Sequence, residues 1–298
     1  MSREYAFGLE SSITSYSANI APTGTKAFIL KLGFLEADSG FFLAGDNIAT
    51  RVNSESGTDP GRRTCKLQMY SVLIDHPSAG LILFEVGPGE DGWENEWGQS
   101  VCEVFYRVDA DESQNLKKAI EAAGYSINDV KHLIIGHLHI DHAGGLQYFK
   151  NRSDIQIWVH ELEFKHAFWA VGTKADIGSY LPYYLDLDLQ WNTFNDHRLD
   201  LFPGVTVQHS PGHTPGLIIL QLNLKHDGTF IFTTDHVILR ENYENGGHVL
   251  GWLQRDHVAW HNSTQNLRRL QTFTNATVVF GHDVDTVDQV LREKPFLH

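Results

Sequence analysis

Residues 131–149 of the chain read KHLIIGHLHIDHAGGLQYF, and this stretch decides the fold. An apolar run ends just before four potential metal ligands, which fall within six residues: His137, His139, Asp141 and His142. Because side chains alternate along a strand, the first two histidines can point the same way, and the turn that follows brings Asp141 and His142 beside them. A lone histidine pair would fit a surface or a core, but four such residues before Gly-Gly predict two metal half-sites side by side.

Three further ligand-type positions lie at the ends of apolar runs. One run leads into the Ser-Pro-Gly-His loop that holds His213, another ends at Asp235, and a third ends at His282. The whole set exceeds what one tetrahedral structural zinc uses, whereas two metal ions that share a bridging carboxylate would use all of it. These residues therefore predict a two-metal site at one edge of the sheets.

The composition limits the classes of function. The chain has 298 residues, 42% of them hydrophobic, and a formal net charge of −14, which is 23 − 37. Because such a surface repels phosphate backbones and anionic lipid, we expect no nucleic-acid and no membrane partner. The first residues lack the apolar stretch of a signal peptide, and no segment approaches the roughly 18 apolar residues that span a bilayer, so we expect a cytoplasmic protein.

Apolar runs of strand length alternate with helical patterns along the chain, which is typical of an α/β fold. The predicted strands are Ala27–Phe34, Leu67–Asp75, Leu81–Val86, His132–Gly136, Ile155–His160, Val205–His209, Leu217–Leu224, Thr229–Thr234 and Ala276–Gly281. Helical spacing occurs at Ser113–Ala123, Val258–Phe273 and Val287–Leu291. Because no linker or composition break divides the chain, we expect one domain, 1–298, with loop or lid insertions at 36–66 and 164–191.

The ligand pattern resembles the metallo-β-lactamase superfamily in its dinuclear hydrolase form. The similarity rests on His-x-His-x-Asp-His at 137–142 and extends from about Ala27 to His282. It implies an α/β fold, the αββα sandwich, with two mixed β-sheets packed face to face and helices outside. It also implies that one metal ion binds His137, His139 and His213, that the other binds Asp141, His142 and His282, and that Asp235 bridges both. Two zinc ions are the implied cofactor, with manganese or iron as alternatives.

The chemistry follows from such a site. A hydroxide held between two cations has its pKa lowered from about 15.7 to about 7, which makes it a nucleophile toward a carbonyl at neutral pH. Asp141 is the candidate proton carrier and Asp235 the bridge, so both are predicted to be catalytic. One position departs from the family pattern, because Glu85 stands where relatives commonly carry aspartate before glycine, and the longer side chain could hold the ligands differently.

Several branches of the superfamily fit the sequence poorly. Nucleases need a basic surface. Glyoxalase II-like thioesterases, which stay an alternative, carry a further C-terminal domain, and flavo-diiron relatives replace His139 with glutamate. The β-lactamases generally lack the bridging aspartate. The chain resembles most the N-acyl homoserine lactonases and the fungal γ-lactamases that open benzoxazolinone-like rings. Ile238 stands where lactonases often carry a tyrosine, which favours lactams and other small rings over acyl homoserine lactones.

We therefore expect a dinuclear zinc hydrolase that opens a small lactone or γ-lactam ring. Two rivals belong to other classes: a mononuclear-iron persulfide dioxygenase and a metal-binding scaffold without catalysis. The expected substrate is a small uncharged ring with an apolar part, and edge aromatics allow a homodimer without requiring it. The candidate substrate-binding residues are Trp93, Trp97, Met69, Phe168, Trp169, His236 and Tyr243. For each of them, ordinary packing is the alternative reading.

Overall fold

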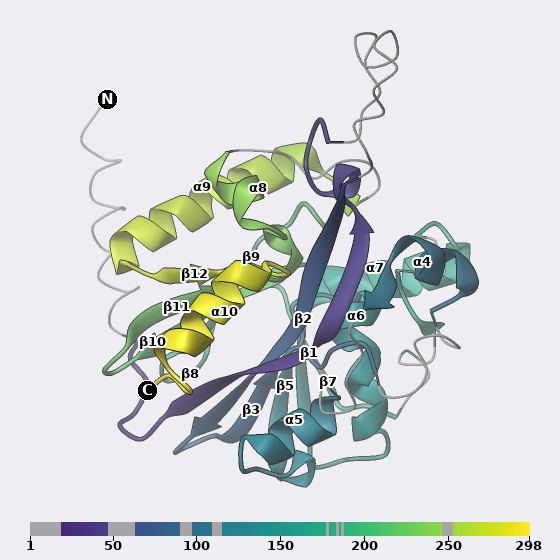
Figure 1. The fold of residues 1–298 in the computed structure, drawn as a ribbon. Helices are drawn as coiled ribbons and strands as arrows, with labels where there is room; N and C mark the ends of the chain where they lie inside the picture. The colour runs from purple at the N-terminus through teal and green to yellow at the C-terminus, as the bar shows by residue number, and fades with distance from the viewer. Residues whose placement is uncertain are drawn as a thin grey trace, which may run out of the picture.

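The apolar runs of the sequence form two β-sheets that lie face to face, with helices on the outer sides (Figure 1). The computed structural model describes residues 19–46, 63–89, 97–108, 115–176, 179–182, 185, 188–245 and 253–298. Trp93 and most of the predicted loop at 36–66 lie outside these ranges. The arrangement confirms the predicted αββα sandwich.

The larger sheet has seven strands in the order β4-β1-β2-β3-β5-β6-β7. They are β1 (Lys26–Asp38), β2 (Thr64–His76), β3 (Gly80–Phe84), β4 (Tyr106–Val108), β5 (Val130–Ile134), β6 (Gln156–His160) and β7 (Trp191–Phe194). Strands β4, β1, β2 and β3 pair antiparallel, whereas β3, β5, β6 and β7 pair parallel. The sheet is therefore mixed, as expected.

The smaller sheet has five strands in the order β12-β11-β10-β9-β8. They are β8 (Arg198–Phe202), β9 (Val205–His209), β10 (Ile218–Leu224), β11 (Gly228–Phe232) and β12 (Thr277–Val279). Strands β8 to β11 pair antiparallel, and β12 joins β11 in parallel. As a result β9, β11 and β12 run in the same direction, and their C-terminal ends meet at one edge.

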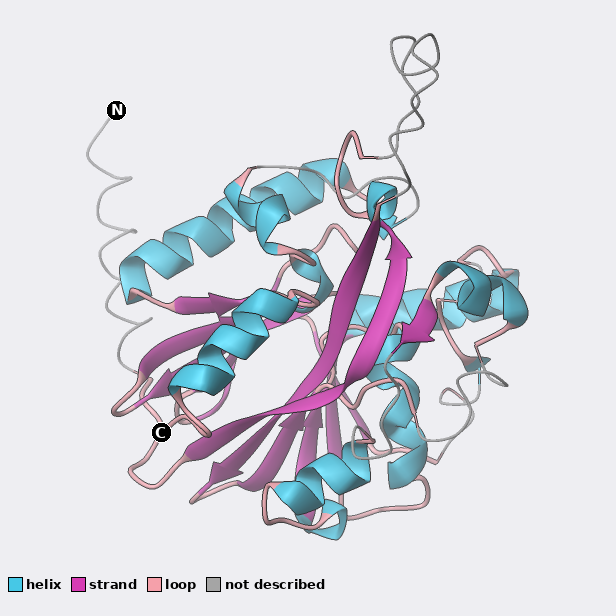
Figure 2. Ribbon diagram, viewed as in Figure 1, coloured by secondary structure: helices cyan, strands magenta, loops and turns pink. Residues whose placement is uncertain are grey.

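Most helices lie on the outer sides of the two sheets, whereas one packs Val287 and Val290 into the core between them (Figure 2). The α-helices are α4 (Gln99–Val104), α5 (Leu116–Ala122), α6 (Ile140–Ala143), α7 (Glu161–Thr173), α8 (Arg240–Glu244), α9 (His257–Thr274) and α10 (Val284–Glu293). Short 3₁₀ turns occur at η1 (Ser39–Phe41), η3 (Ile127–Asp129), η4 (Gly144–Phe149) and η6 (Thr234–His236). The N-cap of helix α9 is Asp256, whose side chain accepts a hydrogen bond from the Ala259 amide, and its C-cap is Asn275 in the left-handed conformation.

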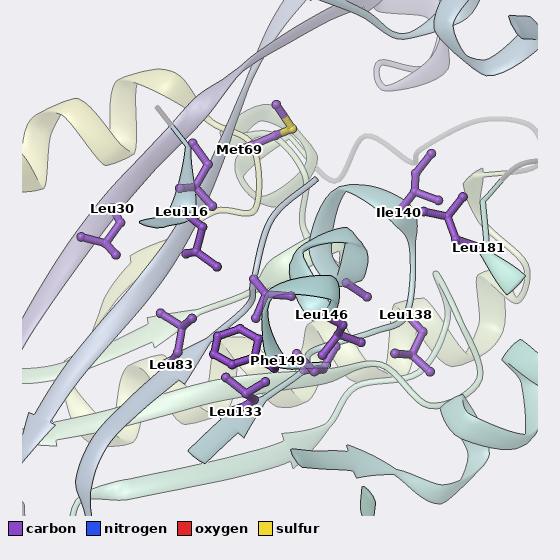
Figure 3. Close-up of a cluster of buried hydrophobic side chains, with 14 of the residues drawn as sticks. Leu30, Met69, Leu83, Leu116, Leu133, Leu138, Ile140, Leu146, Phe149 and Leu181 are labelled. Carbon is purple, nitrogen blue, oxygen red and sulfur yellow. The ribbon is translucent and has the colours of Figure 1, made fainter. Parts of the chain in front are cut away.

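Alternating side chains divide the core into layers, as a strand period of two requires. On the inner face of the larger sheet, Val72 and Ile82 join the core between the sheets. On its outer face, Leu73, Leu83 and Leu133 pack with residues of the helical layer, among them Phe149 (Figure 3). A third cluster lies between the smaller sheet and helix α9. These layers fix both sheets and so fix the loops at their edge.

The two segments predicted as loop or lid insertions contain some regular structure. In the segment 36–66, β1 continues to Asp38 and β2 already begins at Thr64, so strand pairing extends into the predicted loop. In the segment 164–191, α7 connects β6 to β7. Within the described part of the chain, no helix has both the length and the apolar character needed to cross a membrane.

Candidate metal centre

The seven predicted ligands sit on loops at one edge of the sandwich. The segment from His137 to His142 leaves β5 and enters α6, and His213 lies between β9 and β10. Asp235 belongs to the turn after β11, and His282 follows β12. Because β9, β11 and β12 share one direction, their C-terminal loops converge, and each lies close to the end of β5.

The structure brings the seven side chains together in two groups. The first comprises His137, His139, His213 and Asp235, and the second comprises Asp141, His142, Asp235 and His282. Within each group one potential ligand atom per residue lies within 4.8 Å of the others. Asp235 belongs to both groups, so a metal ion in each would share its carboxylate.

The two oxygens of Asp235 face different groups. Its Oδ2 lies 3.3 Å from Nε2 of His213 and 3.7 Å from Nε2 of His137. Its Oδ1 lies 2.9 Å from Nε2 of His282 and 3.0 Å from Nε2 of His142. This is the geometry that a bridging carboxylate needs.

Three of the histidines are oriented through their second ring nitrogen. Nδ1 of His213 hydrogen-bonds to the Leu253 carbonyl, and Nδ1 of His282 lies 3.1 Å from the Gln68 carbonyl oxygen. Both carbonyls accept, so each Nδ1 donates and each Nε2 keeps its lone pair for the interior of the cluster. Such partners are typical of imidazoles that ligate metal ions.

Glu85 orients the third of these histidines. Its Oε2 lies 3.1 Å from Nδ1 of His142, and its Oε1 accepts a hydrogen bond of 2.8 Å from the Gly136 amide. A Cβ at position 136 would lie 2.1 Å from that oxygen, so the contact requires glycine. Glu85 itself has a φ of 64°, a left-handed conformation that costs a non-glycine residue free energy. The Glu85 side chain thus reaches both the His142 ring and the Gly136 amide.

The donor set fits metal ions better than it fits hydrogen bonding. Both ring nitrogens of His137, and Nε2 of His139, lack a hydrogen-bond partner among the described residues. Burial holds the pKa of both imidazoles well below the usual value, so both are neutral and can ligate. Burial alone would raise the pKa of Asp235, but the histidines around it, with His282 first, hold that pKa well below its ordinary value. Buried imidazoles without partners beside an ionised carboxylate are what a metal ion would satisfy.

A cavity with about 520 Å³ of empty space opens above the cluster. Its floor includes His139, Asp141, His213, Asp235 and His282, with Ser179 beside them. Its walls are apolar and consist of Leu35, Phe42, Leu67, Trp97, Val101, Phe105, Ile140, Ile238 and Leu253. The shape and lining are those of a small-molecule site with polar groups at one end.

Two of the predicted substrate-binding residues lie near the cluster. Trp97 lines the cavity and is almost fully buried. Met69 lines a smaller hollow behind the second group, together with Asp141, His142 and His282.

Four others lie elsewhere. Phe168 and Trp169 are 48% and 53% exposed on α7, and neither lines the cavity. His236 is fully buried, with its Nε2 3.3 Å from the Thr264 hydroxyl. Tyr243 faces the outer core, because α8 turns its ring onto Phe280, and its hydroxyl donates to Gln271. Closeness to Asp235 in the sequence therefore does not bring the last two into the cavity.

The sequence analysis missed most of the apolar wall. Phe42 lies in the segment 36–66 that was predicted as a loop or lid insertion, and Val101 and Phe105 lie on and after the short helix α4. The apolar triplet Phe41-Phe42-Leu43 within that polar segment was the one available signal. The wall residues come from distant parts of the chain and meet only in the folded protein.

The structure is thus a two-sheet sandwich with a His/Asp cluster at its edge that could hold metal ions. The family model described as the metallo-beta-lactamase superfamily matches residues 66–282. The chain belongs to the metallo-β-lactamase superfamily.

Its relatives include N-acyl homoserine lactonases. AiiB of Agrobacterium fabrum is 28% identical over 273 residues, which cover 87% of this chain and 94% of that protein. AttM of Rhizobium radiobacter is 30% identical over 227 residues, which cover 72% and 81%. Among solved structures, an N-acyl homoserine lactone hydrolase with N-hexanoyl-L-homoserine at its catalytic metal center has a TM-score of 0.71 at 23% identity, covering 89% and 95%. AidC, a dizinc quorum-quenching lactonase, has a TM-score of 0.63 at 15% identity, covering 88% of each chain.

Proposed function

We propose that the two groups hold two zinc ions and that the enzyme opens the lactone ring of an N-acyl homoserine lactone. The observation that carries the two-metal site is Asp235, which turns one oxygen toward each group, and the similarity to N-acyl homoserine lactonases supports the lactone over the lactam that Ile238 favours. When bound, two such ions supply an activated water at neutral pH and positive charge for the oxyanion. Imidazole and carboxylate suit zinc, and manganese and iron are the alternatives that metal analysis separates.

The residues of the chain bind, orient and transfer protons. His213, His282 and His142 are held by the Leu253 carbonyl, the Gln68 carbonyl and Glu85, so their Nε2 atoms are oriented before any substrate arrives. Of the two carboxylates, Asp141 has the more exposed side chain, 17% against 8% for Asp235, and it lines the cavity. It is therefore the group that can pass a proton to the departing ring oxygen.

The cavity supports an uncharged substrate with an apolar tail. None of the described residues that line it is a lysine or an arginine. Arg255, whose charge helps to lower the pKa of His137 and His139, is engaged with Asp176 and with the His213 carbonyl. A carboxylated substrate would therefore find no counter-charge in the side chains of the wall, whereas an acyl chain would bury against Phe42, Trp97 and Phe105.

The test is metal quantification followed by a turnover panel. The panel holds acyl homoserine lactones of short and long chain, a γ-lactam such as benzoxazolinone, aryl esters and glutathione thioesters. We expect two zinc ions per chain and the highest kcat/KM on long-chain lactones, and we expect Asp235→Asn to lose metal and turnover together. Faster turnover of the lactam, which Ile238 in the wall would favour, contradicts the lactone assignment. One iron per chain with oxygen uptake on a persulfide contradicts the hydrolytic proposal itself.

A further inference from the structure

Helix α7 places a carboxylate in the interior that the proposed reaction does not use. Glu163 is fully buried, and its two oxygens accept three hydrogen bonds. Oε1 accepts from the Leu138 amide at 2.9 Å and from the Tyr180 hydroxyl at 3.1 Å. Oε2 accepts from the Thr214 hydroxyl at 2.5 Å. A buried carboxylate is costly unless every oxygen is paired, and here all three partners are donors.

The three donors belong to the scaffold of the first ligand group. Leu138 stands between His137 and His139, so its amide fixes the backbone that carries both imidazoles. Thr214 directly follows His213. The ring of Tyr180 meets the ring of His139 edge-on, with centroids 4.8 Å apart. Glu163 thus reaches the surroundings of every histidine in this group.

Close packing allows this reach. A Cβ at Gly216 would lie 2.0 Å from the backbone nitrogen of Glu163, so the loop that carries His213 approaches α7 as near as a glycine permits. The donors come from loops of both sheets, since Leu138 follows β5 and Thr214 lies between β9 and β10. One side chain therefore sets the distance between two loops that belong to different sheets.

We propose that Glu163 is a positioning residue for the first metal group, and that it holds His137, His139 and His213 at the spacing one ion requires. The imidazoles of the second group have other partners, Glu85 on His142 and the Gln68 carbonyl on His282. This inference rests on the two-metal centre proposed above, but not on the identity of the substrate. Its distinctive consequence is selectivity, because loss of Glu163 weakens one of the two sites more than the other.

The test measures metal retention, not turnover. Glu163→Gln keeps the shape but removes the negative charge, and it turns an NH₂ either toward the Thr214 hydroxyl, which must then accept instead of donate, or toward the Leu138 amide, which cannot accept. In a titration with a metal chelator, we expect the variant to release one ion per chain at a roughly 10- to 100-fold lower chelator concentration than the wild type. The other ion should shift by less than about threefold. Cobalt substitution gives a second readout, because the visible spectrum of the three-histidine site should change while that of the other site is kept.

Two further variants make the result decisive. Glu161→Gln lies on the same helix, where Glu161 pairs with Lys165 at the surface, and it should leave both ions unchanged. Thr214→Val removes one hydrogen bond without a cavity and should shift the same ion by roughly 2- to 10-fold, which keeps the test open if Glu163→Gln does not fold.

Retention of both ions as in the wild type, or equal weakening of both, would overturn the proposal, because a merely structural glutamate would lower both affinities together. A wild type that binds two ions but opens no lactone would refute the proposed substrate and leave this inference standing. A wild type that binds no metal would refute both.

Discussion

Replacement of Glu85 by glutamine should weaken the second metal group without changing the volume of the core. Glu85 now accepts two hydrogen bonds, at 3.1 Å from Nδ1 of His142 and at 2.8 Å from the Gly136 amide. In Glu85→Gln, whichever way the amide is turned, its NH₂ meets one of these two donors. If it meets His142, that ring satisfies it only by moving its proton to Nε2, the atom 3.0 Å from Asp235, and a protonated Nε2 cannot ligate.

The magnitude follows from the contact that is lost. A hydrogen bond to a charged group contributes about 1.5–3 kcal/mol, and the loss of a partner that orients a ligand lowers metal affinity by about 10- to 100-fold. We therefore expect Glu85→Gln to release one ion per chain at about 10- to 100-fold lower chelator activity, and Glu85→Asp to do the same because the shorter side chain withdraws from both donors.

The assay is chelator competition with metal counting, and its control is Glu244→Gln, an exposed carboxylate on α8. If Glu85→Gln and Glu244→Gln both bind the two ions with affinities within threefold of the wild type, the reasoning is refuted. It would mean that the carboxylate does not set the tautomer of His142.

Two further predictions concern the cavity and the pH dependence. Because Trp97 lines the apolar wall, Trp97→Leu should raise KM for long-chain lactones by about 3- to 10-fold more than for short-chain ones. The control is Trp169→Leu on the exposed face of α7, which should leave both KM values unchanged. Equal shifts of KM for the two chain lengths would contradict this role of the wall. The second concerns His160, whose ring stacks on His209 with centroids 4.1 Å apart and whose pKa burial lowers to about 4. Since the unfolded imidazole takes up a proton near pH 6.5 and the folded one only near pH 4, the free energy of unfolding should fall as the pH drops between these values. His160→Asn keeps the cap on the Leu162 amide and should flatten that dependence in urea unfolding of the metal-free protein; an unchanged slope would contradict the assignment.

The strands that could be predicted are those with continuous apolar runs. Residues such as Leu220 and Phe232 lie in the core between the sheets, and burial on both faces of a strand leaves a strong pattern. The missed strands β4, β7 and β8 are edge strands, short and mostly half-exposed, so their residues alternate weakly. Helix α7 was missed for another reason: Phe168 and Trp169 are exposed, whereas its buried positions hold Glu163, Ala167 and Ala170, so the helix has no clear apolar stripe.

The ligand residues could be named from the sequence because their chemistry depends on local spacing at strand ends. The cavity wall could not, because its members share no spacing. Phe42 follows the 3₁₀ turn η1 after β1, and Phe105 follows α4, so the centroids of their rings lie 6.2 Å apart only after the sheet has formed. Tyr243 shows the opposite error, because a short helix after Asp235 turns it to the outer core. Positions near a ligand in sequence are thus weaker guides than positions at the same sheet edge.

Each ligand group draws on both sheets, since His137 and His142 follow β5 whereas His213, Asp235 and His282 follow strands of the smaller sheet. An ion bound in either group would link the two sheets of the sandwich. At a free metal concentration 100 times its dissociation constant, such an ion would add about 2.7 kcal/mol to the free energy of unfolding. A less stable sandwich opens more often to proteases. The steady-state level of this protein in a cell would therefore depend on the supply of metal, even without substrate.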